Sequence, residues 1–315
     1  MSLYFGPRAS QHRCMHKLRL LAVSLMLGAG ISAAQTPAAI TTDPAADKDN
    51  PPAMQSFQIP SHGVGLNALM YIAAGAGPHP VVVLLHGFPG NEKNLDLAQA
   101  IRRAGWDVLY FDYRGSWGTP GDFSFTHSME DTQAAVAFLR DKAYAARLRV
   151  NPQHIVLVGH SMGGMIAAYT AAHDPGIEGV GLISAADMAG RLRGVSNLSA
   201  DVRTTMLARA ALALKAEGMA PLAGCTPESL ALDLMQHADE WTLAAQAAKL
   251  ASRPMLVVTS DDGTEPANDA LVAALDTAGD KEVKAVHIAT DHSYSGKRIE
   301  LEETVLDGLA YLGQK

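Results

Sequence analysis

Apolar runs typical of buried strands alternate with helix-patterned segments along most of the chain. The run at residues 80–85 is continuous in valine and leucine, which is typical of a strand buried on both faces of a sheet. Further strand-like runs lie at 107–111, 154–158, 179–183, 254–260 and 283–288, and helical spacing lies between and after them at 95–104, 129–146, 162–173, 267–278 and 295–312. Two earlier segments, 57–60 and 66–73, predict a hairpin. The alternation predicts an α/β fold with a mainly parallel sheet and crossover helices.

One long insertion interrupts the alternation between residues 187 and 253. It is rich in Ala, Leu and Met at helical spacing and contains no convincing strand, so it predicts an inserted helical cap. The whole chain has 315 residues, of which 48% are hydrophobic and 18% charged. This composition provides enough apolar side chains for a large core and excludes disorder for most of the chain. We expect the folded domain, with its cap, to cover residues 53–315.

The first 34 residues have the pattern of a secretory signal. The basic residues Lys17 and Arg19 precede an apolar run at 20–33 that is too short to span a membrane. Small residues, Ser32 and Ala34, then occupy the two positions that a signal peptidase reads. We therefore expect cleavage near Ala34 and export to the periplasm or the exterior, without a stable membrane anchor. An uncleaved anchor or a buried helix is the alternative.

Two further features concern the ends of this signal. Met15 as well as Met1 could start the chain, because Met15 would itself begin a compact basic region. The segment that follows the cleavage site, residues 35–52, carries three Pro-containing polar stretches and no apolar periodicity. It has the composition of a flexible leader.

Charge and cysteine content exclude several classes of function. The chain has 25 Lys and Arg against 32 Asp and Glu, and its basic residues are not concentrated in one stretch, so nucleic acid is not an expected partner. Its two cysteines, Cys14 and Cys225, rule out a disulfide framework and lack the spacing of a zinc site. The sequence also lacks a Walker motif, a dinucleotide-binding glycine motif and an HExxH motif. We therefore expect no cofactor and no metal.

A serine between glycines follows one of the predicted strands. The motif Gly-His-Ser-Met-Gly at 159–163 comes directly after the apolar strand at 155–158 and opens the helical segment at 162–173. The G-x-S-x-G spacing is typical of a sharp strand-to-helix turn that exposes a serine hydroxyl at the carboxyl edge of a sheet. A serine that only caps the helix is the simpler alternative. We predict that Ser161 is a nucleophile.

A serine nucleophile needs a base, and His292 is the candidate. A serine hydroxyl attacks poorly until a base removes its proton. His292 follows the predicted strand at 283–288 and precedes the last helix, which places it on a loop at the same sheet edge as Ser161. The other histidines belong to neighbouring motifs or lie within apolar elements. We predict His292 as the base.

The orienting acid is expected in the loop after the strand at 254–260. Asp261 and Asp262 both stand there, and we prefer Asp262. Either aspartate could instead be a turn or helix-capping residue. Asp187, which follows the strand at 179–183, is a further candidate.

Backbone amides that stabilise a tetrahedral intermediate are expected in two turns. The motif His-Gly-Phe-Pro-Gly at 86–90 follows the buried strand at 80–85. The amides of Phe88 and Met162 can converge on one oxygen, whereas Pro89 has no N–H to donate. We predict these two amides as the oxyanion hole.

Together these motifs resemble those of serine hydrolases with the alpha/beta-hydrolase fold, over roughly residues 57–312. The matching pieces occur in family order at 86–90, 111–118, 159–163, Asp262 four residues before Pro266, and 291–292. The resemblance implies an eight-stranded, mainly parallel sheet flanked by helices. It also implies Ser161 as nucleophile, His292 as general base and acid, Asp262 as orienting acid, and the Phe88 and Met162 amides as oxyanion hole.

Two details refine the resemblance. The stretch at 113–116 is also similar to dienelactone-hydrolase-like and prolyl-oligopeptidase-type relatives. Ser260 stands where many family members carry glycine, and the spacing from the strand to the aspartate is one residue shorter than usual. The shorter spacing argues against Asp262 as the family's acid.

The expected function is an exported carboxylic-ester hydrolase that acts on a small-molecule ester through an acyl-enzyme. A serine peptidase or amidase of the prolyl oligopeptidase type would use the same catalytic residues. A catalytically inactive binding protein on the same scaffold is a third possibility, against which the intact Ser161, His292 and acid argue. The Ala-, Leu- and Met-rich cap predicts a preference for apolar acyl groups.

Overall fold

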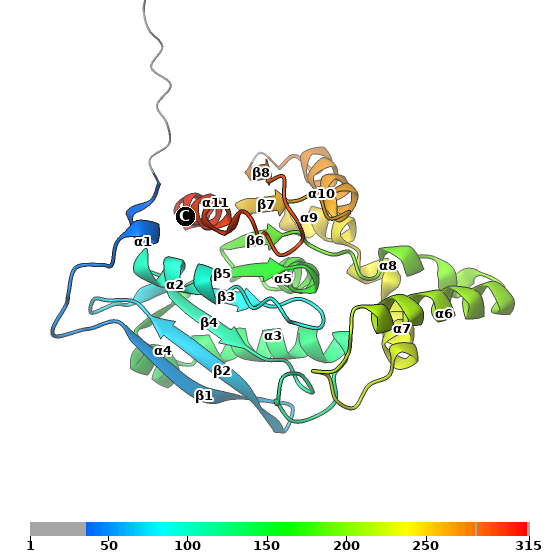
Figure 1. Ribbon diagram of the computed structural model, residues 1–315, viewed down its shortest axis with the longest axis horizontal. Helices are drawn as coiled ribbons and strands as arrows, with labels where there is room; N and C mark the ends of the chain where they lie inside the picture. The colour runs from blue at the N-terminus through cyan, green and yellow to red at the C-terminus, as the bar shows by residue number, and fades with distance from the viewer. Residues whose placement is uncertain (1–35, 281, 314–315) are drawn as a thin grey trace, which may run out of the picture. The chain divides into compact units, whose positions relative to one another are not determined.

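The computed structural model describes residues 36–280 and 282–313, so the predicted signal segment lies outside the described residues. The domain is built on one eight-stranded sheet with helices on both faces (Figure 1). The strand order is β1-β2-β4-β3-β5-β6-β7-β8. The predicted α/β architecture, with an eight-stranded and mainly parallel sheet, is confirmed.

The first two strands are antiparallel and the rest of the sheet is parallel. β1 (Ala53–Ser61) and β2 (Val64–Ile72) form the predicted hairpin, with both strands longer than the sequence pattern indicated. β2 pairs antiparallel with β4 (Asp107–Phe111). Parallel pairing then continues through β3 (His79–Leu85), β5 (Val150–His160), β6 (Gly179–Ile183), β7 (Met255–Thr259) and β8 (Val283–His287).

Alternate side chains of the central strands enter two separate cores. Val81 and Val83 of β3 pack into the core beneath α3 (Phe125–Arg140), α4 (Lys142–Leu148), α5 (Met162–His173) and α10 (Glu265–Thr277). Val82 and Leu84 pack into the opposite core, beneath α2 (Leu95–Arg103) and α11 (Arg298–Leu312). Successive side chains of a strand point to opposite faces, so a continuous apolar run is needed where both faces are covered.

One predicted helix is wrong in its extent. The pattern at 129–146 predicted a single helix, but the structure has α3 and α4 separated at Asp141. The Asp141 carboxylate accepts hydrogen bonds from the backbone amides of Ala143 and Tyr144, at 2.9 and 3.2 Å, and so caps α4. An aspartate competes for backbone groups in this way and favours a helix start over a helix interior.

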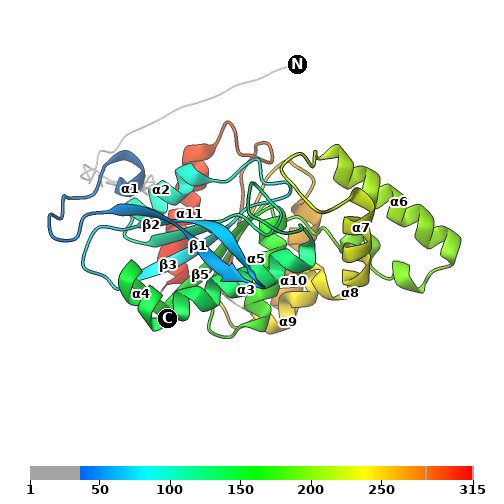
Figure 2. The ribbon, with the colours of Figure 1, turned by 90° about the horizontal axis from the view of Figure 1, so that it is seen from below.

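The elements described between β6 and β7 are all helical. They are η1 (Gly190–Leu192), η2 (Val195–Asn197), α6 (Ala200–Ala216), α7 (Pro227–Gln236), α8 (Ala238–Trp241), η3 (Leu243–Gln246) and α9 (Ala247–Leu250). α6 and α7 pack together at the end of the domain opposite α4 (Figure 2). This is the insertion at 187–253 that the sequence predicted as a helical cap.

The cap is attached to the loop between β4 and α3. The amide of Ala223 donates to the carbonyl of Gly115 at 2.8 Å, and the amide of Phe123 donates to the carbonyl of Ala223 at 2.9 Å. The Asp233 carboxylate of α7 also accepts from the amide and hydroxyl of Thr126, at 3.0 and 2.6 Å, in the first turn of α3. A carboxylate at a helix N-terminus is stabilised by the free amides there.

Part of the predicted leader is docked on the domain. α1 (Ala38–Thr41) packs against α2 and α11, and Arg103 donates through Nε to the carbonyl of Ala39 at 2.5 Å. Ala39 and Ile40 cover apolar side chains of the core beneath α2 and α11, which gives these leader residues a place to pack.

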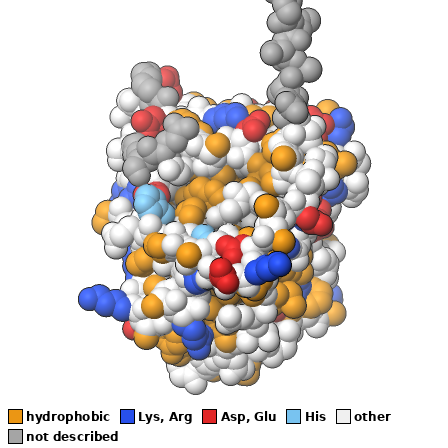
Figure 3. Space-filling model, turned by 90° about the vertical axis from the view of Figure 1, so that its left-hand side faces the viewer, with side chains coloured by type: hydrophobic (Ala, Val, Ile, Leu, Met, Phe, Trp, Pro, Cys, Tyr) orange, Lys and Arg blue, Asp and Glu red, His pale blue; other side chains and the backbone are white. Residues whose placement is uncertain are grey.

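None of the described helices is long and apolar enough to cross a membrane. On the face shown in Figure 3, acidic and basic side chains are interspersed with apolar ones.

Candidate active site

Ser161 occupies a strained turn between β5 and α5. Its backbone angles, φ 57° and ψ −123°, are rare for a residue with a side chain. Its amide donates to the carbonyl of Ile183 at 2.9 Å, which ties the turn to the neighbouring strand β6. A side chain at Gly159 would collide with the backbone of Gly163, and a side chain at Gly163 would collide with the carbonyl of Leu85. Both glycines are therefore required by close backbone packing around the serine.

The turn after β3 lies against Ser161. A Cβ atom on Gly87 would lie 2.9 Å from Cβ and 3.4 Å from Oγ of Ser161. The next residue, Phe88, packs its ring against Phe123 and Phe125, with centroid distances of 5.9 and 5.8 Å. Phe88 thus follows a glycine that lies against Ser161, and Met162, the first residue of α5, follows Ser161 directly. Convergence of their two amides on one oxygen stays a prediction.

His292 is hydrogen-bonded to Asp262. The distance between Nδ1 of His292 and Oδ2 of Asp262 is 2.6 Å, and the Asp262 side chain is only 3% exposed. The two residues follow β7 and β8, which are parallel neighbours, so their loops leave the sheet at the same edge. The structure therefore brings together two of the three residues that the sequence predicted.

The other two candidate acids do not contact His292. The Asp261 carboxylate lies 3.2 Å from Nε2 of His287 and is 63% exposed. Asp187 lies in the loop before η1, where burial raises the pKa of its carboxyl. The preference for Asp262 over these rivals agrees with the geometry.

Hydrogen bonds keep Asp262 ionised although it is buried. Burial alone would raise its pKa, but donation from His292, and from the amide and hydroxyl of Thr264 at 2.8 and 2.7 Å, holds the pKa well below its usual range. An ionised carboxylate can only accept hydrogen bonds, so Nδ1 of His292 carries the proton of this bond. In a neutral imidazole, Nε2 is then the nitrogen left to accept a proton.

His160 connects the His292 loop to the serine turn. Its Nε2 donates to the carbonyl of His292 at 2.8 Å, and the two rings lie 4.7 Å apart between centroids. Burial, followed by the field of His292, lowers the pKa of His160 to about 4, so its ring is neutral at neutral pH. His292 is thereby held against the residue immediately before Ser161. From the sequence pattern, His160 was predicted only as a neighbour within the serine motif.

Arg298 holds the same loop from its other side. Its Nη1 donates to the carbonyl of Ser293 at 3.0 Å, while its other nitrogens bind the carboxylate of Asp96 and the side chain of Asn94 at the start of α2. Arg298 has no motif signal in the sequence, and only the fold brings it next to a residue about 200 positions earlier. This ion pair limits the movement of the His292 loop.

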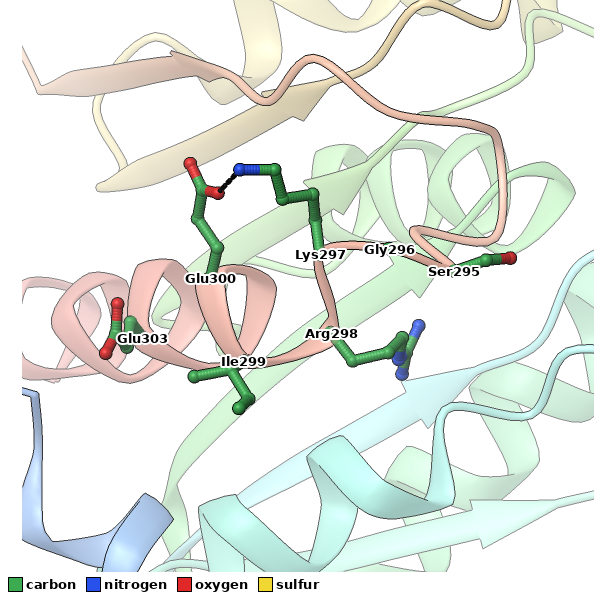
Figure 4. A pocket seen from close by; sticks show the side chains of 7 residues that line it. All are labelled: Ser295, Gly296, Lys297, Arg298, Ile299, Glu300 and Glu303. Carbon is green, nitrogen blue, oxygen red and sulfur yellow. Dashed lines mark ion pairs between the residues drawn. The ribbon is translucent and has the colours of Figure 1, made fainter.

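Two hollows open on the surface near these loops. The larger, of about 600 Å³, lies at the start of α11 and is lined by Ser295, Gly296, Lys297, Arg298, Ile299, Glu300 and Glu303 (Figure 4). The smaller, of about 460 Å³, lies between Asn91, Trp117 and the cap segment at 217–221. Trp117 donates through Nε1 to the carbonyl of Pro89 at 2.9 Å, so the smaller hollow borders the turn that carries Phe88. It is the better candidate for a substrate entrance.

His86 begins the same turn and is completely enclosed. Its Nδ1 donates to the carbonyl of Gly87 at 2.8 Å, and its ring lies 4.5 Å from that of Tyr113 between centroids. Burial lowers the pKa of His86 to about 4, although the bond to Gly87 and the charge of Asp112 oppose this effect.

Within the described part of the chain, His, Cys, Asp and Glu side chains form no group of three or more that could hold a metal ion.

The fold and these motifs define the class of the protein. A sequence model of the alpha/beta hydrolase fold matches residues 80–293, about two thirds of the chain. The chain therefore belongs to the alpha/beta hydrolase family, as its motifs predicted.

Individual relatives share parts of the sequence or the whole fold. An uncharacterized protein of Mycobacterium tuberculosis is 31% identical over 114 residues, which are 36% of this chain and 39% of that protein. The sn-1-specific diacylglycerol lipase ABHD11 of Xenopus tropicalis is 34% identical over 103 residues, which are 32% of this chain and 30% of the lipase. The chain thus spans about a third of the length of these relatives. A solved esterase from Pyrobaculum calidifontis superposes with a TM-score of 0.60 at 22% identity, covering 83% of this chain and 85% of the esterase.

The buried neutral state of His86 predicts a pH-dependent stability. Its pKa is about 4 in the folded protein and about 6.5 when unfolded, so the unfolded state binds the proton first as the pH falls. Between pH 7 and pH 5, wild type should lose about 2 kcal/mol more unfolding free energy than His86→Gln. Urea denaturation at both pH values measures this difference.

The matched control is His62→Gln, because the His62 side chain is 54% exposed. This variant should lose stability between pH 7 and pH 5 as wild type does. Equal losses in wild type and His86→Gln would contradict the assignment of a neutral, buried His86.

Proposed function

We propose that this protein is an exported serine hydrolase that cleaves carboxylic esters of small molecules through an acyl-enzyme. Ser161 is the nucleophile, His292 the general base and acid, and Asp262 the orienting acid. The observation that carries the proposal is the 2.6 Å hydrogen bond from His292 to the buried Asp262 carboxylate. A carboxylate in this position orients an imidazole and stabilises the imidazolium that forms during attack.

The reaction has two halves. In the first, Nε2 of His292 takes the proton of Ser161 while its oxygen attacks the ester carbonyl, and His292 then gives that proton to the departing alcohol. In the second, His292 takes a proton from water, the resulting hydroxide attacks the acyl group, and the proton returns to Ser161 as the acid leaves. The amides of Phe88 and Met162 stabilise the oxyanion of each tetrahedral intermediate.

Ester cleavage is proposed in preference to amide cleavage because of the proteins that this chain is similar to. The Xenopus relative is named a diacylglycerol lipase, and the solved neighbour from Pyrobaculum is an esterase. Phe88, Phe123 and Phe125 also form an aromatic cluster beside the turn that faces Ser161. Phe123 and Phe125 are buried in the core, so the cluster supports the turn that carries Phe88.

Replacement of the nucleophile tests the core of the proposal. Ser161→Ala should fold normally and lose several orders of magnitude in kcat on chromogenic esters of graded acyl length. The same panel includes aminoacyl and prolyl anilides, and wild type should turn over the esters faster. A fluorophosphonate probe should label wild type and fail to label Ser161→Ala. Preferential cleavage of the anilides would establish the amidase alternative, and undiminished labelling of the variant would place the nucleophile elsewhere.

A pair of neighbouring aspartates tests the acid. Asp262→Asn should reduce kcat by about four orders of magnitude, because an amide in place of the carboxylate favours the wrong imidazole tautomer. Asp261→Asn is the matched control and should reduce kcat only slightly, since its carboxylate is exposed and faces His287. Steady-state kinetics on one ester measures both variants. The reverse ranking, or loss of activity in Asp187→Asn alone, would contradict the choice of Asp262.

Export is tested separately from catalysis. If the site at 32–34 is used, mature protein from the periplasm or the medium should begin at Gln35. N-terminal sequencing of fractionated cells measures this. A cytosolic pool with an intact N-terminus, and none outside the cytoplasm, would contradict export and leave the catalytic proposal standing.

A further inference from the structure

A row of three buried hydroxyl groups lies behind the Asp262 carboxylate. Ser184 follows β6, Ser260 follows β7, and Tyr294 lies in the loop after β8, so three adjacent strand ends each contribute one hydroxyl. All three side chains are completely buried. The hydroxyl of Tyr294 lies 2.8 Å from that of Ser184, which lies 2.9 Å from that of Ser260.

The row ends on the same carboxylate oxygen that binds His292. Ser260 donates to Oδ2 of Asp262 at 2.9 Å, and His292 donates to this oxygen at 2.6 Å. The other oxygen, Oδ1, is occupied by the amide and hydroxyl of Thr264. Ser260 therefore shares an acceptor atom with the proposed catalytic histidine.

Because each hydroxyl has a single hydrogen, the donor and the acceptor of every hydrogen bond among Tyr294, Ser184, Ser260 and Asp262 are determined. Each hydroxyl has one hydrogen to donate, and an ionised carboxylate has none. Ser260 gives its hydrogen to Asp262, so Ser184 must donate to Ser260. Tyr294 in turn donates to Ser184. Hydrogen bonds that run in one direction polarise one another, so the outer members strengthen the bond that reaches the carboxylate.

We infer that Ser260, supported by Ser184 and Tyr294, positions the Asp262 carboxylate and tunes its attraction for the His292 imidazole. These are positioning residues, because they act through Asp262 and do not touch the substrate. The inference deepens the proposed function and rests on it. It also gives Ser260 a role at the position where many family members carry glycine.

The charged and titratable groups around His292 are unchanged by removal of a hydroxyl. They are His160, whose ring faces that of His292, Asp291 immediately before it, Arg298 on the loop carbonyl of Ser293, and Asp262 itself. A difference between wild type and a hydroxyl-deleted variant therefore reports on the row of hydroxyls.

The experiment compares Ser260→Ala and Tyr294→Phe with the matched control Ser128→Ala. Ser128 in α3 is also a completely buried serine, but its hydroxyl donates to the carbonyl of Ser124, the residue before this helix, and not to a carboxylate. Two quantities are measured for each protein: the pH profile of kcat/KM on an ester, and the low-field proton NMR signal of the His292 Nδ1–H. The NMR signal is identified by its loss in His292→Gln.

Ser260→Ala should lower kcat roughly 10-fold with little change in KM, the size expected for loss of one hydrogen bond to a charged group. With one donor fewer, the carboxylate attracts the imidazolium proton more strongly. The acidic limb of the profile should therefore move up by about 0.5 pH unit, and the NMR signal should shift. Tyr294→Phe should change both quantities in the same direction by a smaller amount, about 2- to 3-fold in kcat. Ser128→Ala should change neither.

The inference is overturned if Ser260→Ala and Tyr294→Phe match Ser128→Ala in both the pH profile and the NMR signal. If Ser260→Ala does not fold, Tyr294→Phe alone decides by the same criteria. If Ser161→Ala keeps its activity, the proposed function fails instead. The NMR comparison then still tests the coupling of the hydroxyls to the pair of Asp262 and His292.

Discussion

The close contact between the backbones of β3, β5 and α5 is the constraint on which the site depends. Gly159 and Gly163 allow the helix to begin directly above the strand ends, because no Cβ atom fits at either position. That contact forces Ser161 into a backbone conformation that side chains rarely adopt. It also places the turn of Gly87 and Phe88 against the serine, so the predicted nucleophile and the predicted oxyanion hole follow from one packing requirement.

The parallel sheet assembles the remaining residues at the same edge. Ser161, Asp262 and His292 follow β5, β7 and β8, and parallel strands of one sheet end on one side. Residues 131 positions apart in the chain are thereby brought to neighbouring loops. His160 and Arg298 then hold the His292 loop through backbone carbonyls, which constrains the loop without using the imidazole itself.

Burial gives the polar groups of this edge their distinct charge states. His86 and His160 are enclosed without an anionic hydrogen-bond partner, and burial lowers the pKa of each to about 4. Asp262 is enclosed with several donors, and its pKa lies well below the usual range. The same loss of solvent therefore yields neutral imidazoles in two places and an ionised carboxylate in a third. The difference is whether the hydrogen-bond partners around each group stabilise its charged form.

Local pattern was enough to predict the strands, the helical insertion and the strand-to-helix turn that carries Ser161, since apolar periodicity and the glycines around the serine follow from short-range geometry. The single helix expected at 129–146 was wrong because periodicity does not register the local competition of the Asp141 side chain for backbone amides. Asp261 and Asp262 could not be separated with certainty by their positions in the chain, because both follow the same strand. Only the tertiary structure distinguishes their surroundings, by turning the Asp261 carboxylate to solvent and enclosing that of Asp262 among His292, Thr264 and Ser260. Side-chain direction in a loop depends on what packs around it, and those neighbours come from distant parts of the chain.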